Sequence, residues 1–232
     1  MTSETSIRIR SGEIELDARI VVPTGATRAC VVCHPHPLYG GDMHNPVVVA
    51  ITRALGAAAV ATLRFDFRGV GLSGGSHGGG TPEIDDARAA VDTLAAATGL
   101  AAVAIAGYSF GSLIALRLAA SADDGAEVSA SNGGAAAVSR GPGATARVRI
   151  GAVAAVAPPL AMFDATFVTR IACPSLLLAG DRDAYCPRSD FEALAARLPE
   201  RATTALVAGA DHFFAGRERE VADAVVRWFG GI

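Results

Sequence analysis

The stretch AIAGYSFGSLIAL, residues 104–116, decides the fold. Residues 101–106 form a short apolar run typical of a buried strand, and the residues from 110 onward continue without a helix breaker. Ser109 therefore stands on a strand-to-helix corner, between Gly107 and Gly111. Glycines at these positions let strand and helix approach closely, which lifts the serine hydroxyl above the carboxyl edge of the sheet. The corner suits a nucleophile beside N–H groups that bind a developing oxyanion, although a chain with 26 glycines can also contain GxSxG by chance.

Strands and helices alternate along the chain. Residues 6–10 and 13–22 predict an antiparallel hairpin. Short apolar runs predict further strands at residues 30–33, 60–65, 101–106, 150–156, 175–179 and 203–207. Helical stretches lie at residues 47–58, 82–97, 110–120, 190–198 and 217–229. This order predicts an α/β fold: a doubly wound, mainly parallel sheet with an N-terminal antiparallel hairpin.

Composition excludes several classes of function. The 232 residues are 51% hydrophobic and 19% charged, which fits one globular domain over residues 1–232. A net charge of −3 without a basic patch argues against nucleic-acid binding. The N-terminal residues lack a secretory pattern and no apolar run could span a bilayer, so we expect a cytoplasmic protein that does not bind membranes. Cys30 and Cys33 spell CxxC, but strand alternation places them on opposite faces, as buried small hydrophobes.

Residues 121–146 interrupt the alternation of strands and helices. They are rich in alanine, glycine and serine and contain few large apolar residues, which predicts a flexible, low-complexity insertion. The insertion joins the end of a helix to the start of a strand. We therefore expect it at the sheet edge away from Ser109, where it cannot act as a lid.

A serine nucleophile needs a base, usually a histidine that a carboxylate orients. His212 follows the last predicted strand and so shares the carboxyl edge of the sheet with Ser109. His44 and His77 are better interpreted as surface-loop histidines. Asp181 and Asp183 follow the preceding strand, and either could be the acid.

With these residues the chain resembles the α/β-hydrolase superfamily. The superfamily acid commonly lies in a GxxDxxxP pattern, which Gly180, Asp183 and Pro187 fill here, so the resemblance implies Asp183. The order Ser109, Asp183, His212 is also the superfamily order. The likeness extends to small lidless bacterial serine hydrolases with an HPHPxxGG loop, often compared with dienelactone hydrolases.

The HPHPLYGG loop, residues 34–41, stands where these hydrolases place their second oxyanion donor. Proline has no N–H, which leaves the amide of His36 as the candidate and that of Leu38 as the alternative. The first donor should be the amide of Phe110. His34 and His36 could suggest a metal pair, but two imidazoles without carboxylate or cysteine partners are a weak zinc signal. We therefore expect neither a metal nor a cofactor.

Gly69, Gly71 and Gly74 spell GxGxxG, a pattern that can cradle a dinucleotide when a helix opens there. Residues 73–81 are rich in helix breakers, so the helix should begin only near Pro82. The stretch instead resembles the structural DxRGxGxS loop of the superfamily, at Asp66, Arg68, Gly69, Gly71 and Ser73. A nucleotide-dependent oxidoreductase is thus the weaker hypothesis.

Together these roles predict a serine hydrolase that cleaves short-chain carboxylic esters through an acyl-enzyme on Ser109. Residues 157–174 are too few for a large cap domain, so we expect an open site for a small-molecule ester. Its substrate-binding residues are predicted to be Leu38, Tyr39, Tyr108, Met162 and Phe213. Thioesterase, lactonase, peptidase or perhydrolase chemistry on the same triad stays open, as does a non-catalytic binding or scaffold protein. We expect a monomer or a homodimer.

Overall fold

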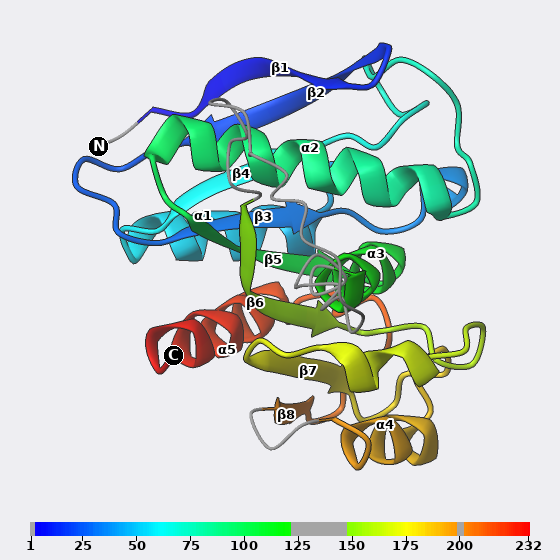
Figure 1. Cartoon of the computed structure of the whole chain (residues 1–232). Coiled ribbons are helices and arrows are strands. Elements are labelled where there is room, and N and C mark those ends of the chain that lie inside the picture. Colours follow the sequence, from blue (N-terminus) through cyan, green and yellow to red (C-terminus); the bar gives the residue numbers. More distant parts are fainter. Residues whose placement is uncertain (1–2, 122–147, 199–201) are drawn as a thin grey trace, which may run out of the picture.

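One sheet runs through the molecule (Figure 1). The computed structural model describes residues 3–121, 148–198 and 202–232. Within these ranges the strand order is β1-β2-β4-β3-β5-β6-β7-β8. The bounds are β1 (Thr5–Ser11), β2 (Ile14–Val21), β3 (Ala29–Cys33), β4 (Ala61–Phe65), β5 (Ala102–Tyr108), β6 (Arg149–Val156), β7 (Ser175–Gly180) and β8 (Ala202–Val207). Only β1 with β2 and β2 with β4 pair antiparallel, which confirms the predicted hairpin and the mainly parallel sheet.

Helices cover both faces of the sheet. They are α1 (Pro46–Ala57), α2 (Thr81–Thr98), α3 (Phe110–Ser121), α4 (Arg188–Ala195) and α5 (Glu218–Gly230), with two 3-10 helices, η1 (Pro37–Tyr39) and η2 (Thr166–Arg170). Apolar residues of α1 and α5 pack on one face, and those of α2, α3 and α4 pack on the other (Figure 1). The sheet is therefore doubly wound, as its alternating sequence predicts.

Side-chain alternation along the strands explains the two cores. In β3, Cys33 belongs to the core under α2 and α3, whereas Cys30 belongs to the core under α1 and α5. The two thiols thus lie on opposite faces, as predicted. Burial raises the pKa of Cys30 to about 12, which keeps this thiol protonated.

Two sequence predictions concern the connections after α3 and β6. Ser121 is the last residue of α3, and the rest of the predicted insertion 121–146 lies outside the described residues. Residues 157–174, between β6 and β7, contain only the short helix η2, so no large cap stands there. Over the ranges that the structure describes, no helix is long and apolar enough to cross a membrane.

Candidate active site

The corner between β5 and α3 holds Ser109 in an unusual backbone conformation. Its φ of 54° lies in the left-handed region, which a residue with a side chain rarely adopts and which stores strain. A side chain at Gly107 would collide with the carbonyl of Gly111, and one at Gly111 would collide with the carbonyls of Cys33 and His34. Both glycines are thus required by close backbone approach, and the corner projects the Ser109 hydroxyl from the sheet edge.

Ser109, His212 and Asp183 form a chain of hydrogen bonds at the carboxyl ends of β5, β7 and β8. Ser109 Oγ lies 2.9 Å from His212 Nε2. His212 Nδ1 lies 2.9 and 3.0 Å from the two carboxylate oxygens of Asp183. His212 and Asp183 are buried, so bulk water weakens these contacts little. The structure brings together the three side chains that the sequence selected.

Each of the three nearby carboxylates has a distinct set of partners. Asp183 faces His212 and also accepts the N–H groups of Tyr185 and Cys186, at 2.8 and 3.0 Å. Asp181 instead accepts the N–H of Gly209 at 2.7 Å. Asp211, which adjoins His212 in sequence, accepts the N–H of Phe213 at 3.0 Å. Of the two candidates that position alone allowed, Asp183 is the one that contacts the histidine.

Tyr108 links the nucleophile corner to the histidine loop. Its hydroxyl donates a hydrogen bond of 2.8 Å to the backbone carbonyl of His212. The ring is buried, and burial is the main cause that raises the pKa of the phenol, which therefore stays a donor. The sequence suggested this tyrosine only as cavity lining, because nothing in a local motif indicates a contact between residues 108 and 212.

The HPHPLYGG loop crosses the other side of Ser109. His36 Nδ1 accepts the N–H of Leu38 at 3.2 Å, and the N–H groups of Tyr39 and Gly41 donate to the His36 carbonyl at 3.1 and 3.0 Å. Because the Leu38 amide is engaged, His36 is the better placed of the two second-donor candidates. Within the described residues, the N–H groups of His36 and Phe110 have no protein acceptor, as an oxyanion site requires.

His34, buried at the start of this loop, is engaged through both ring nitrogens. Nδ1 lies 2.6 Å from the Pro35 carbonyl, and Nε2 accepts the N–H of Phe67 at 3.0 Å. Burial lowers the pKa of His34 to about 4, so the ring is neutral at pH 7. Neither nitrogen is available to form a metal pair with His36, and the described residues contain no cluster of three potential ligands.

A cavity of about 440 Å³ opens above Ser109. It is lined by Pro35, His36, Tyr39, Gly40, Gly41, Asn45, Tyr108, Ser109, Phe110, Pro159, Met162, Phe163, Tyr185, His212 and Phe213. Four predicted substrate-binding residues, Tyr39, Tyr108, Met162 and Phe213, are among them. The fifth, Leu38, is not among the residues that line this cavity. Successive side chains of a 3-10 helix point about 120° apart, so Leu38 and Tyr39 of η1 point in different directions and only Tyr39 reaches the cavity lining.

Asn45 and Tyr185 also line the cavity but were missed from the sequence. Asn45 caps α1, since its side-chain oxygen accepts the N–H of Val47 at 3.0 Å. An asparagine before Pro46 and an apolar run is a recognisable helix start, which could have located the residue. Tyr185 follows Asp183 by two residues, and no pattern distinguished it from an ordinary loop residue.

The GxGxxG stretch forms a loop before α2, which begins at Thr81 as the helix breakers predicted. The Ser73 hydroxyl donates to the Asp66 carbonyl at 2.7 Å, and Arg68 pairs with Asp86 at 2.7 Å. Its polar side chains thus stabilise the loop itself. The interpretation of His77 as a surface histidine is wrong, since its side chain is only 12% exposed.

Comparisons with known proteins agree with this geometry. Residues 26–161 match the family described as serine aminopeptidase, S33. An uncharacterized protein of Rickettsia prowazekii is 32% identical over 204 residues, which are 84% of this chain and 75% of that protein. The solved structure of an α/β serine hydrolase homologue from Coxiella burnetii has a TM-score of 0.79 and 28% identity, and covers 98% of this chain and 97% of its own. A lidless α/β serine hydrolase from Xanthomonas campestris has a TM-score of 0.78 and 25% identity, with coverages of 98% and 94%.

Proposed function

Because the chain belongs to the serine aminopeptidase S33 family, within the α/β-hydrolase superfamily, we propose that it is a serine hydrolase of short-chain carboxylic esters. The observation that carries the proposal is the hydrogen-bonded chain from Ser109 through His212 to Asp183, at the base of a cavity over which residues 157–174 form no large cap. The expected cytoplasmic location, and a monomer or homodimer acting on a small-molecule ester, stay predictions.

In the acylation step, Ser109 Oγ bonds to the ester carbonyl carbon while its proton passes to His212 Nε2. Asp183 stabilises the resulting imidazolium, and the amides of Phe110 and His36 hold the oxyanion. When the tetrahedral intermediate collapses, the bond to the alcohol oxygen breaks. His212 returns the proton to that oxygen, and the alcohol leaves.

In the deacylation step, His212 takes a proton from water as the water oxygen attacks the acyl carbonyl. The second tetrahedral intermediate collapses with cleavage of the bond to Ser109 Oγ, which recovers its proton from His212. The carboxylic acid product then leaves, and the free enzyme is restored. The same two steps would process a thioester or a lactone.

The cavity lining favours a neutral ester over a peptide with a free amino terminus. Its described lining residues include no aspartate or glutamate that could pair with an α-ammonium group, and no lysine or arginine that could pair with a carboxylate. A buried charge without a partner is costly, so a charged substrate end would bind poorly. Aromatic side chains such as Phe163, Tyr185 and Phe213 suit small apolar acyl and alcohol groups.

The first test compares the wild type with Ser109→Ala on p-nitrophenyl acetate and butyrate. We expect kcat/KM to fall by about 10⁴-fold or more, since the residues of a triad act as a unit. Ser121→Ala is a matched control, because its hydroxyl, at the far end of the same helix, donates to the Leu118 carbonyl. That variant should keep wild-type activity.

Two further measurements distinguish the alternatives. A fluorophosphonate should label Ser109, as mass spectrometry of the digested protein can show. A wild type that hydrolyses no ester and takes no label would support the non-catalytic scaffold. Faster cleavage of an aminoacyl p-nitroanilide than of the esters would favour a peptidase and contradict our choice of substrate.

A further inference from the structure

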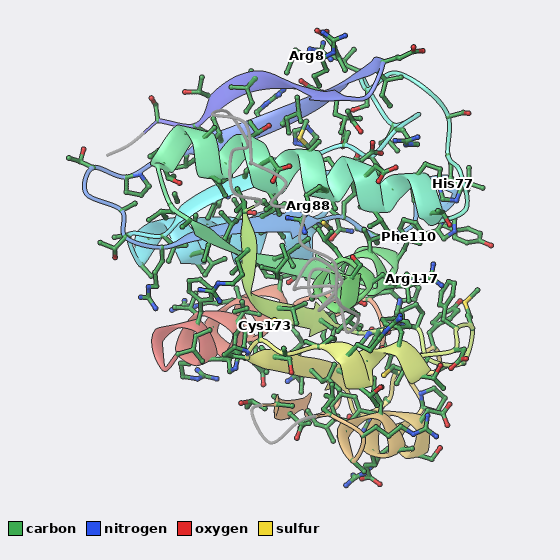
Figure 2. All side chains as sticks on the ribbon, viewed as in Figure 1. Arg8, His77, Arg88, Phe110, Arg117 and Cys173 are labelled. Atoms are coloured by element: carbon green, nitrogen blue, oxygen red, sulfur yellow. The ribbon has the colours of Figure 1, made fainter. Side chains whose placement is uncertain are left out.

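A cluster of rings joins both candidate oxyanion donors to a histidine from the loop before α2. The ring centroid of His36 lies 4.9 Å from those of Phe110 and His77, and His77 lies 5.5 Å from Phe110. Figure 2 shows His77 beside the start of α2, with Phe110 at the start of α3 next to it. The cavity lining includes His36 and Phe110 but not His77, so His77 contacts the site through these two ring neighbours.

Glu83, in the first turn of α2, lies against His77. Its side chain is 0% exposed, and its Oε1 lies 3.0 Å from His77 Nδ1. The same carboxylate accepts the N–H groups of Gly78 and Gly80, each at 2.7 Å. A buried carboxylate with two such backbone hydrogen bonds has little freedom to move, and the contact with His77 is an ion-pair distance without hydrogen-bond geometry. The ring of His77 is therefore held at a fixed distance from α2.

The conformation of the His36 loop depends on an unprotonated Nδ1. This nitrogen accepts the Leu38 N–H at 3.2 Å, so a proton there would replace an acceptor by a second donor. Burial lowers the pKa of His36, and the charge of His77 lowers it further, whereas Glu83 opposes both. The other rings that face His36 belong to Tyr39 and to the uncharged Phe110. The neighbours of His36 therefore favour the neutral ring that the loop requires.

We propose that His77 and Glu83 are positioning residues for the oxyanion hole. Glu83 fixes His77, and the His77 ring holds the His36 loop against Phe110, so that both amides serve one oxyanion. The inference rests on the proposed hydrolase function. An oxyanion donor acts mainly on the transition state, so its misplacement should lower kcat more than it changes KM.

The kinetic test uses His77→Ala and Glu83→Gln with a p-nitrophenyl ester. We expect kcat to fall about tenfold in His77→Ala and by a smaller factor in Glu83→Gln, with KM changed less than about twofold. A trifluoromethyl ketone forms a tetrahedral oxyanion on Ser109, so its affinity for His77→Ala should fall by the same factor as kcat/KM.

Asp86→Asn is the matched control. Asp86 lies on the same helix, its side chain is also 0% exposed, and it binds Arg68 and Ser11 instead of the oxyanion loop. This variant removes a buried carboxylate of comparable structural weight, so it should lower the melting temperature. Its kcat and its affinity for the ketone should stay at wild-type values. A fall in kcat seen only in His77→Ala and Glu83→Gln could then not be attributed to a general loss of stability.

A second measurement does not depend on activity. The chain has five histidines, so NMR can follow the titration of the His36 ring in the wild type and in His77→Ala. Loss of His77 removes a charge and part of the burial, so the titration midpoint of His36 should rise. The kcat of the variant should then begin to fall at a higher pH than that of the wild type as the solution is acidified.

The outcomes separate this inference from the proposed function. An active wild type whose His77→Ala variant keeps its kcat and its affinity for the ketone would overturn the positioning role. An inert wild type without Ser109 labelling would refute the hydrolase function. In that case the His36 titration decides alone: an unchanged midpoint in His77→Ala would refute the coupling, and a raised midpoint would support it.

Discussion

His212 and His36 stand on opposite sides of Ser109 and are held in different ways. His212 has hydrogen bonds at both ring nitrogens, to Ser109 and Asp183, and its backbone carbonyl accepts the Tyr108 hydroxyl at 2.8 Å. The His36 ring makes one longer hydrogen bond, of 3.2 Å, and otherwise packs against other rings. Directional hydrogen bonds therefore orient the His212 ring, whereas the His36 ring is held mainly by packing.

This difference follows from what each side is proposed to do. Proton transfer requires the side-chain nitrogen of His212 to point along one line, and hydrogen bonds impose such lines. The oxyanion side uses backbone N–H groups, so its side chains need only keep the loop in place. We therefore expect loss of a ring-nitrogen partner of His212 to lower activity steeply, and loss of a ring neighbour of His36 to lower it by a smaller factor.

The largest effect should come from Asp183→Asn. The asparagine oxygen can still accept the N–H groups of Tyr185 and Cys186, so the loop should keep its shape. The amide cannot stabilise the imidazolium and selects the wrong tautomer of His212, so kcat should fall by about 10³-fold to 10⁴-fold. Steady-state hydrolysis of a short-chain ester measures this change.

Asp181→Asn is the control for that variant, because this carboxylate binds the Gly209 amide instead of His212. It should keep its kcat within about threefold of the wild type, since it loses no contact with a reacting group. If kcat fell less in Asp183→Asn than in Asp181→Asn, the acid of the triad would have to be another group. The contrast between the two sides of the site would then be wrong.

The two sides also differ in how far the sequence predicts them. Ser109, Asp183 and His212 follow strands whose carboxyl ends meet at one edge of the sheet, so position alone indicated Ser109 and His212. Position left Asp181 and Asp183 open, and the resemblance to the superfamily pattern selected Asp183. His77 has no such constraint. It lies in a glycine-rich loop, where no periodicity indicates which side chains turn inward.

Contacts between distant segments could not be predicted from the sequence for the same reason. The bond from Tyr108 to the His212 carbonyl spans 104 positions, and which of Leu38 and Tyr39 lines the cavity depends on the turn of a single 3-10 helix. Backbone topology was predicted because it follows from hydrophobic periodicity. Side-chain partners of loop residues depend on tertiary packing, which one sequence does not encode in a readable pattern.

Acid should destabilise the fold through His34, which lies at the start of the HPHPLYGG loop. Burial lowers the pKa of His34 from 6.5 to about 4. Between these two pH values His34 is therefore protonated in the unfolded chain but neutral in the folded chain. The stability that His34 contributes is fully present above pH 6.5 and declines as pH falls toward 4, by about 3 kcal/mol in all. Urea unfolding at a series of pH values measures it.

His34→Gln isolates this contribution. Glutamine does not titrate, and its side-chain oxygen can accept the Phe67 N–H that His34 Nε2 accepts now. The variant should therefore show a flatter dependence of unfolding free energy on pH than the wild type. Identical slopes in the two proteins would mean that groups other than His34 cause the acid sensitivity.

The smallest effect should come from Tyr108→Phe. This variant tests whether a hydrogen bond to the backbone of His212, rather than to its ring, also helps to orient the ring. The ring stays, but the His212 carbonyl loses its donor, so the imidazole should sample more orientations relative to Ser109. We expect kcat to fall by about five- to tenfold with little change in KM, since only alignment is lost.

Thr52→Val is the matched control for Tyr108→Phe. It removes another buried hydroxyl that donates to a backbone carbonyl at 2.8 Å, that of Val48 within α1, without touching the site. Both variants should lose comparable stability, but only Tyr108→Phe should lose kcat. Equal kcat in the two variants would mean that Ser109 and Asp183 alone orient His212 and that Tyr108 does not contribute.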